Sequence, residues 1–258
     1  MMVVIKEVSA GSVKDSRGER TILARIKTSA GSFSASAPNG KSKGKFEVPP
    51  YKKSIDDDIK TLKKFSDYFS EENIDCFDDL RRIEDVLSGF VGANTLFALE
   101  SAALKAMSRK EKKSVWRLIN SEPLQKLKFP RLVGNCIGGG KHTNHSGTGK
   151  KPDFQEFLLI PEGKSVKESF MASEKIKKYL RNILAKKDEK FEGLKNDEDA
   201  WITSLNEKEV FEILKDEKIS IGTDVAASSF YKRKKYSYEN PVLKRSGEEQ
   251  LSYLSNLI

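Results

Sequence analysis

The sequence has few of the residues that build disulfide frameworks and zinc sites, and it has no long apolar run. Its two cysteines, Cys76 and Cys136, lie 60 residues apart, and it has only two histidines. Neither cysteine has a second thiol or a histidine at zinc-site spacing, so free thiols in a reducing compartment are expected. No window approaches the roughly 18 apolar residues that a membrane span needs. A soluble cytoplasmic protein that contacts no membrane is therefore expected.

Charge is abundant and mixed in sign. The 258 residues are 37% hydrophobic and 33% charged, with a formal net charge of +9. This length favours two domains, each able to bury its own core. The positive balance suits an anionic ligand, but lysine and glutamate alternate along most segments, which is typical of a solvated surface.

The first half of the chain predicts an α+β domain over residues 1–128. Turn signals at glycines separate short runs of β-branched and small residues, which predicts an antiparallel meander of three strands. Helical periodicity follows. The expected strands are residues 3–8, 20–28 and 31–37, and the expected helices are residues 55–69, 77–86 and 92–107.

The second half covers residues 129–258, and Pro130 marks a change in composition at its start. It predicts a strand, a glycine-rich loop, a second strand and a long helix, then a polar loop, a helix, a third strand, a basic hairpin-like segment and a final helix. The strands are expected at residues 131–137, 154–160 and 219–226, and the helices at residues 166–186, 206–215 and 247–258.

Four separated segments resemble enolase, the phosphopyruvate hydratase family, of archaeal type. They are DSRG with the loop APNGKSKGKFE (residues 15–18 and 37–47), GANTLFALESAALKA (92–106), GNCIGGGKH leading to FQEFLLIP (134–142 and 154–161), and IGTDVAASSFY (221–231). NDEDAWITSLN, residues 196–206, is a weaker match. The resemblance implies the enolase amino-terminal domain followed by the first three strands of an eight-stranded α/β barrel.

The resemblance also implies a role for each matched site residue. Ser42 closes over the substrate phosphate and helps to ligate a second magnesium ion, and His142 approaches the bound substrate. Glu156 and Glu198 handle the hydroxyl at the third carbon of 2-phosphoglycerate. Asp224 is the first of three carboxylate ligands to a tightly held magnesium ion. Each residue alone also fits a plainer role, as a loop serine, a surface histidine or a salt-bridged carboxylate.

These residue types suit the implied reaction, the dehydration of 2-phosphoglycerate to phosphoenolpyruvate in glycolysis and gluconeogenesis. Removing a proton beside a carboxylate adds charge to an anionic substrate, and oxygen-ligated Mg²⁺ stabilises that charge. Two carboxylates in a partly dry pocket can have pKa values pushed apart, so that one acts as an acid near neutrality.

Two details depart from the family pattern. The stretch between His142 and Glu156 is about five residues longer than usual and contains His145. Asp199 and Ala200 replace the glycines that normally follow Glu198, which puts its placement in doubt. The loops 37–46 and 143–151 are expected to be mobile without ligand.

The remaining metal ligands and the catalytic lysine of the family lie in the part of the enzyme that the resemblance does not cover, so this chain alone is expected to be inactive. The leading hypothesis is a split enolase, completed by a complementary chain and forming a homo-oligomer through the amino-terminal domain. The alternatives are a non-catalytic enolase-like binding or regulatory module and an interrupted gene. The segment 231–238, YKRKKYSY, could bind RNA, but an exposed hairpin is favoured and nucleic acid is not expected as a partner.

Overall fold

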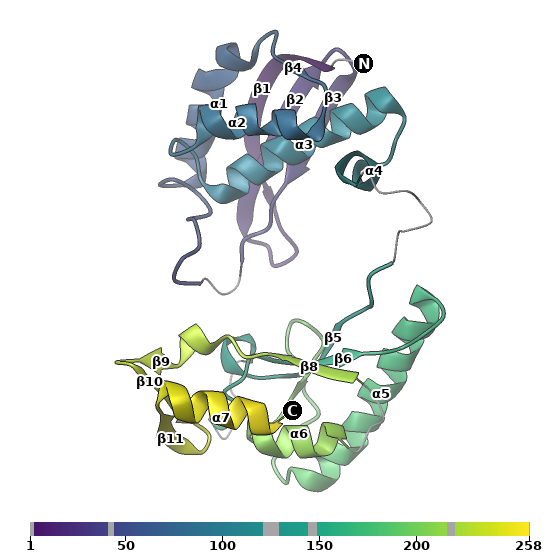
Figure 1. The fold of residues 1–258 in the computed structure, drawn as a ribbon, viewed down its shortest axis with the longest axis vertical. Coiled ribbons are helices and arrows are strands. Elements are labelled where there is room, and N and C mark those ends of the chain that lie inside the picture. Colours follow the sequence, from purple (N-terminus) through teal and green to yellow (C-terminus); the bar gives the residue numbers. More distant parts are fainter. Residues whose placement is uncertain (1–2, 41–43, 121–128, 144–148, 216–219, 258) are drawn as a thin grey trace. The chain divides into compact units, whose positions relative to one another are not determined.

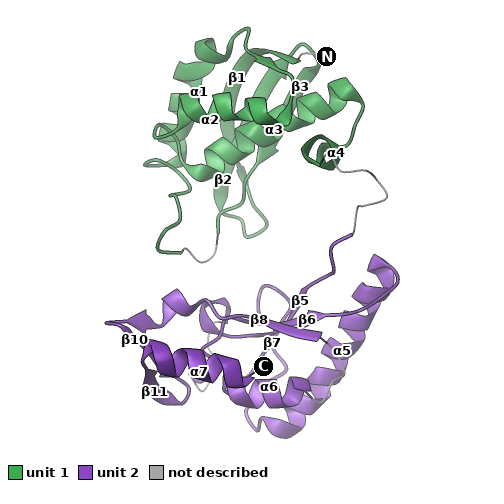
Figure 2. Ribbon diagram, in the orientation of Figure 1, with its two compact units in different colours: residues 1–127 green, residues 128–258 purple. Residues whose placement is uncertain are grey.

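The structure is a computed structural model that describes residues 3–40, 44–120, 129–143, 149–215 and 220–257. The chain forms two compact units, residues 1–127 and residues 128–258 (Figure 2). Each unit has its own hydrophobic core and is described by itself.

Unit 1 is built on a four-stranded antiparallel sheet. Strands β1 (Val3–Lys14), β2 (Arg20–Thr28) and β3 (Gly31–Ser36) form the expected meander, although β1 runs six residues beyond the predicted end at residue 8. The short strand β4 (Asn73–Ile74) adds to β1 and gives the order β3-β2-β1-β4. One face of the sheet carries buried aliphatic side chains such as Ile22, Ala24 and Ile26.

Helices cover that face of the sheet (Figure 1). The helical elements are α1 (Ile55–Phe69), the 3₁₀ turn η1 (Phe77–Asp79), α2 (Leu80–Leu87), α3 (Ala93–Glu111) and α4 (Val115–Ile119). Helix α1 begins where the Ser54 hydroxyl accepts a hydrogen bond from the Asp57 amide, an N-cap that satisfies one of the orphan amides of the first turn. Small alanines let α3 pack closely on β2 and β3, and the predicted broad burial of this helix is confirmed.

A buried carboxylate ties α1 to the start of α3. The Asp58 side chain is fully buried and accepts hydrogen bonds from Thr95 Oγ1 at 2.6 Å, the Gly92 amide at 2.9 Å and the Lys52 amide at 3.1 Å. Gly92 itself leaves no room for a side chain, because an added Cβ would lie 2.2 Å from Tyr51 Cα. Asp58 therefore fixes the segment that leads into α3.

Unit 2 contains a mixed four-stranded sheet in the order β7-β5-β6-β8. Its strands are β5 (Gly134–Gly138), β6 (Glu156–Ile160), β7 (Trp201–Ile202) and β8 (Ser220–Asp224). β6 runs antiparallel to β5 and β8, and β7 runs parallel to β5. The prediction of three strands is wrong, because the segment expected to be a polar loop also pairs with the sheet. Trp201 is buried there and packs against Phe191, which holds β7 in place.

Three helices and a second small sheet complete unit 2. The helices are α5 (Val166–Lys187), α6 (Glu207–Lys215) and α7 (Gly247–Leu257), with 3₁₀ turns η3 (Gly140–His142) and η4 (Ala227–Ser229). The second sheet contains β9 (Tyr231–Lys232), β10 (Lys235–Glu239) and β11 (Val242–Arg245) in the order β11-β10-β9. The core is aromatic, with Phe154 contacting the rings of Phe157, Phe211 and Phe230.

Both cysteines are free thiols; Cys76 is exposed and Cys136 is buried. In the part of the chain that the structure describes, none of the helices combines the length and apolarity needed to cross a bilayer.

Candidate active site

Strand register brings candidate residues to one end of the unit 2 sheet. Gly138, the last residue of β5, lies opposite Glu156, the first residue of β6. Glu156 in turn lies opposite Asp224, the last residue of β8. Because β6 runs against its neighbours, its first residue meets their last residues, and two carboxylates become cross-strand neighbours.

His142 joins the two glutamates. The turn η3 follows β5 and directs the ring toward Glu156 and Glu198, with Nδ1 lying 3.1 Å from Glu156 Oε1 and 2.9 Å from Glu198 Oε2. The side chain is 8% exposed. A carboxylate only accepts hydrogen bonds, so Nδ1 carries the proton and donates it to Glu198.

Close packing of the glycine loop positions His142. A Cβ on Gly139 would lie 2.3 Å from the Phe154 carbonyl oxygen, so only glycine fits at this position. Lys151, at the end of the long stretch, donates hydrogen bonds to the carbonyls of Gly140 at 2.5 Å and Thr143 at 2.8 Å, one on each side of His142. Burial lowers the pKa of Lys151. Lys151 belongs to the long stretch between His142 and Glu156. Through these two hydrogen bonds it holds the loop that carries His142.

Glu198 is presented by a tight turn that Asn196 organises. The side-chain oxygen of Asn196 accepts hydrogen bonds from the amides of Glu198 and Ala200, and its nitrogen donates to the His142 carbonyl. Asp199 adopts φ 61°, a conformation that favours glycine. Its carboxylate accepts hydrogen bonds from Lys177 and Lys195, both at 2.6 Å, which hold the pKa of Asp199 below its usual value.

Lys177 and Lys195 contact the turn at Asp199, where aspartate replaces the glycine of the family pattern. In this turn Glu198 lies within hydrogen-bond distance of His142. Asn135 Nδ2 also donates to Glu198 Oε2 at 3.1 Å. Glu198 therefore lies against His142 and Asn135 although aspartate and alanine follow it in the sequence.

The environment of Glu156 favours its protonated form. Burial raises the pKa of Glu156, the nearby charges of Glu198 and Asp224 raise it further, and His142 opposes the shift. Two acidic side chains close together cannot both ionise at their ordinary pKa. Glu198, in contrast, accepts hydrogen bonds from His142 and Asn135. The pair can therefore divide into an acid, Glu156, and a carboxylate, Glu198.

Asp224 lies beside this cluster with an exposed carboxylate. Gln155 Nε2 donates to Asp224 Oδ2 at 3.1 Å, and the Ala226 amide donates to Oδ1 at 3.0 Å. Gln155 Oε1 and Thr143 Oγ1 are buried and have no hydrogen-bond partner among the described residues. Buried polar groups are normally paired, so these two atoms mark a place where a polar ligand would be satisfied.

Two kinds of metal donor set are present. His142, Glu156 and Glu198 offer one nitrogen and two oxygen atoms within 4.8 Å of one another, a combination that suits zinc-like ions. The hard ion Mg²⁺ prefers oxygen alone, which the exposed carboxylate of Asp224 supplies. This carboxylate fits magnesium in kind but falls short of the six donors that its octahedron requires.

The structure brings together four of the five predicted site residues, His142, Glu156, Glu198 and Asp224. Ser42 and His145 lie outside the described residues, as do residues 41–43 and 144–148 of the two loops expected to be mobile. The sequence did not single out Asn135, Gln155 and Asn196, although all three lie inside the segments that carried the resemblance. For Gln155, its position directly before Glu156 was the available signal.

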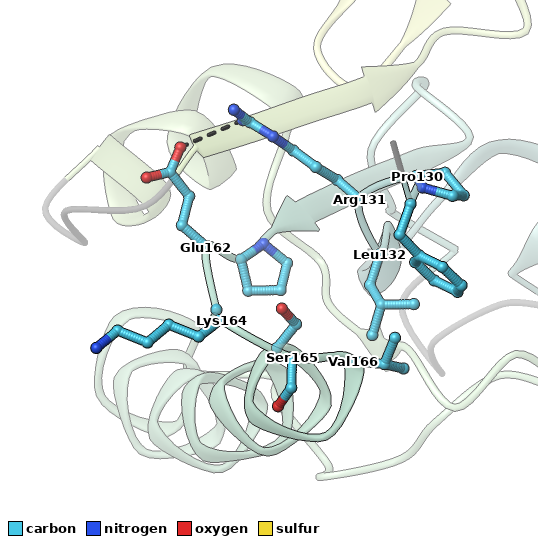
Figure 3. A pocket seen from close by; sticks show the side chains of 11 residues that line it. Pro130, Arg131, Leu132, Glu162, Lys164, Ser165 and Val166 are labelled. Atoms are coloured by element: carbon cyan, nitrogen blue, oxygen red, sulfur yellow. Dashed lines mark ion pairs between the residues drawn. The ribbon is translucent and has the colours of Figure 1, made fainter. Parts of the chain in front are cut away.

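A separate cavity of about 430 Å³ lies beyond the other end of β6 (Figure 3). Residues 129–132, before β5, line it together with residues 161–166 at the start of α5. Arg131 pairs with Glu162 across its mouth at 3.2 Å. Ser165 and Glu168 cap the first turn of α5. Among the described residues that line this cavity, none has a buried polar side-chain atom without a hydrogen-bond partner.

The fold and the site define a carboxylate-lined centre at one end of a mixed α/β sheet. The family model "Enolase, C-terminal TIM barrel domain" matches residues 126–256. The chain is also 32% identical to the enolase of Methanosphaera stadtmanae over 277 aligned positions, which cover 99% of this chain and 65% of the relative. The enolases of Methanothermobacter thermautotrophicus and Thermoplasma acidophilum are 30% and 31% identical, covering 100% and 98% of the chain and 65% of each relative.

The chain therefore belongs to the enolase family, and the family named from the four segments is confirmed. It spans about 65% of the length of these relatives.

Proposed function

We propose that this chain supplies one part of a split enolase, which converts 2-phosphoglycerate to phosphoenolpyruvate and water together with a second polypeptide. The observation that carries the proposal is the convergence of His142, Glu156 and Glu198 next to Asp224 at one end of the sheet. Four segments that are distant in sequence form this cluster. A set of isolated structural carboxylates would not need to converge with a buried histidine.

In the proposed reaction, Glu156 is the acid. The raised pKa of Glu156 keeps its proton available, and it donates that proton to the hydroxyl leaving the third carbon, which departs as water. Glu198, with His142, orients the same hydroxyl. Ser42 is assigned to the substrate phosphate and the second metal ion from the resemblance alone. The carbon–hydrogen bond next to the substrate carboxylate is broken by a base that the second polypeptide brings.

Asp224 would hold magnesium in this scheme, with Gln155 fixing the carboxylate. When bound, the ion stabilises the extra negative charge that proton removal creates on the substrate. One carboxylate leaves the octahedron incomplete, so in this scheme further carboxylates come from the second polypeptide.

The sheet edge supports a second chain. β8 is an edge strand of the described sheet, bonded to β6 on one side. Edge strands expose unpaired amide and carbonyl groups that another strand can bind. Asp224 ends this strand, so a strand added there parallel to β8 would bring its own last residues next to the proposed metal site.

Complementation tests the proposal. The chain is co-expressed with a polypeptide made of the part of the M. stadtmanae enolase that it does not match, and the products are separated by size-exclusion chromatography. The matched control is the M. stadtmanae enolase divided at the same position. We expect both pairs to co-elute and to form phosphoenolpyruvate, while this chain alone forms none.

If the divided control is active and this chain neither co-elutes nor becomes active at high magnesium, the split-enzyme proposal fails. The non-catalytic enolase-like module then takes its place.

A further inference from the structure

The hairpin β9–β10 has a turn of unusual composition. Arg233 and Lys234 connect the strands with φ angles of 50° and 63°. Two-residue hairpin turns with positive φ at both positions strongly prefer asparagine or aspartate followed by glycine, because a Cβ is strained there. Two long cationic side chains therefore occupy positions where their backbone conformation is unfavourable.

The strands on either side repeat the charge. Lys232 lies directly opposite Lys235 in the antiparallel register, and like charges in such a pair repel. Residues 232–235 are all exposed, and among the described residues none of them has an acidic partner within ion-pair distance. Lys235 interacts electrostatically with Glu249, but the Glu249 carboxylate accepts its hydrogen bonds from Ser246. The hairpin thus concentrates four positive charges at a local energetic cost.

An aromatic surface adjoins these charges. Tyr231 and Tyr236 are paired across the strands with ring centroids 4.7 Å apart, and the Tyr231 side chain is 46% exposed. β9 is an edge strand and lies at the margin of unit 2 in Figure 1. A molecule bound at the charged tip could therefore also stack on Tyr231.

We propose that the hairpin Tyr231–Tyr236 binds single-stranded nucleic acid. The four cations would contact successive phosphates, and Tyr231 would stack on a base, which is how sequence-tolerant single-strand sites are built. No large apolar side chain accompanies the cations at residues 232–235, so insertion into a lipid surface is not favoured. The sequence alone favours an exposed hairpin for this segment. The structure adds the turn geometry, the opposed lysines and the aromatic pair.

Fluorescence anisotropy with a labelled 15-nucleotide oligouridylate tests the proposal on the full chain. Four phosphate contacts predict that the logarithm of the binding constant falls with the logarithm of salt concentration at a slope of about −2.8. Arg233→Asn combined with Lys234→Gly restores the preferred turn residues and removes two charges. This double variant should keep or raise thermal stability, weaken binding at least roughly tenfold at low salt, and reduce the slope by about 1.4.

Two further variants separate the contributions. Tyr231→Ala should weaken binding roughly fivefold or more with an unchanged slope, because stacking is not a counterion effect. Lys63→Gln with Lys64→Gln, two exposed lysines on α1, is the charge-matched control and should change neither quantity.

The proposal is overturned if the hairpin double variant binds like the unmodified chain, or if the α1 control loses as much affinity. It is also overturned if duplex DNA, or vesicles containing anionic lipid, bind as tightly as the single strand. Those results would assign the surface to general electrostatics or to membranes.

Discussion

Asp224 lies directly opposite Glu156 across β8 and β6, and its charge helps to raise the pKa of Glu156. Replacing Asp224 with asparagine removes that charge while keeping the approximate shape and a hydrogen-bonding oxygen. The pKa of Glu156 should therefore fall in Asp224→Asn. Carboxyl ¹³C NMR titration of the metal-free chain measures this shift. The control is Asp85→Asn in unit 1, which should leave the Glu156 titration unchanged.

The glycine loop gives a stability prediction. Gly139→Ala places a Cβ 2.3 Å from the Phe154 carbonyl oxygen, so the loop that carries His142 must move. We expect unfolding free energy to fall by about 3 kcal/mol, the upper end of the overpacking range. Urea denaturation followed by fluorescence measures it. Gly134→Ala, at the start of the preceding strand β5, is the control, because its nearest contact would be 3.9 Å away. An equal loss in both variants would contradict the packing argument.

The buried carboxylate of unit 1 gives a second stability prediction. Asp58→Ala leaves the Thr95 hydroxyl and two amides without their acceptor, and should cost about 2–4 kcal/mol. Asp67→Ala, at an exposed position of the same helix, should change stability by no more than about 0.5 kcal/mol. Thermal unfolding monitored by circular dichroism compares the two, and similar losses would show that Asp58 is not a structural link.

Asp188 makes stability depend on pH. Burial alone would raise the pKa of Asp188, but hydrogen bonds from Ser204, Thr203 and Lys190 outweigh it and leave the pKa lowered. Because the folded pKa lies below the unfolded one, this stabilisation is present above the unfolded pKa, near 3.9. It is lost as pH falls through the folded pKa.

Asp188→Asn should accordingly lower the free energy of unfolding at pH 7. The difference in unfolding free energy between this variant and the unmodified chain should become smaller as pH falls below about 4. Urea denaturation at a series of pH values provides the comparison. The neighbouring exposed variant Glu189→Gln should follow the unmodified chain, and a constant difference between Asp188→Asn and the unmodified chain at all pH values would contradict this assignment.

The sequence predicted elements whose periodicity is strong. Helix α1 runs from Ile55 to Phe69 as expected, because apolar spacing and the Ser54 cap agree. The two-residue strand β7 is too short to leave a period-2 pattern, and only the tertiary packing of Trp201 identifies it. Local sequence signals decide long elements, whereas short strands depend on contacts with distant residues.

The candidate site was predictable in the residues that carry the resemblance, and less so in the residues that hold them in place. His142, Glu156, Glu198 and Asp224 stand out through motif position. The turn at Asp199 is contacted by Lys195 and by Lys177, which lies on the distant helix α5. The sequence alone therefore could not decide whether the replaced glycines displace Glu198.

The division of roles between Asp224 and Glu156 is the central claim. A magnesium titration of phosphoenolpyruvate formation by the complemented pair tests it most directly. Asp224→Asn should raise the magnesium concentration needed for activity, because it removes a metal ligand. Glu156→Gln should leave that concentration unchanged and lower the maximal rate by about 100-fold or more, because it removes the acid. If Glu156→Gln shifts the magnesium requirement as much as Asp224→Asn does, or if it leaves the maximal rate intact, the proposed roles are wrong.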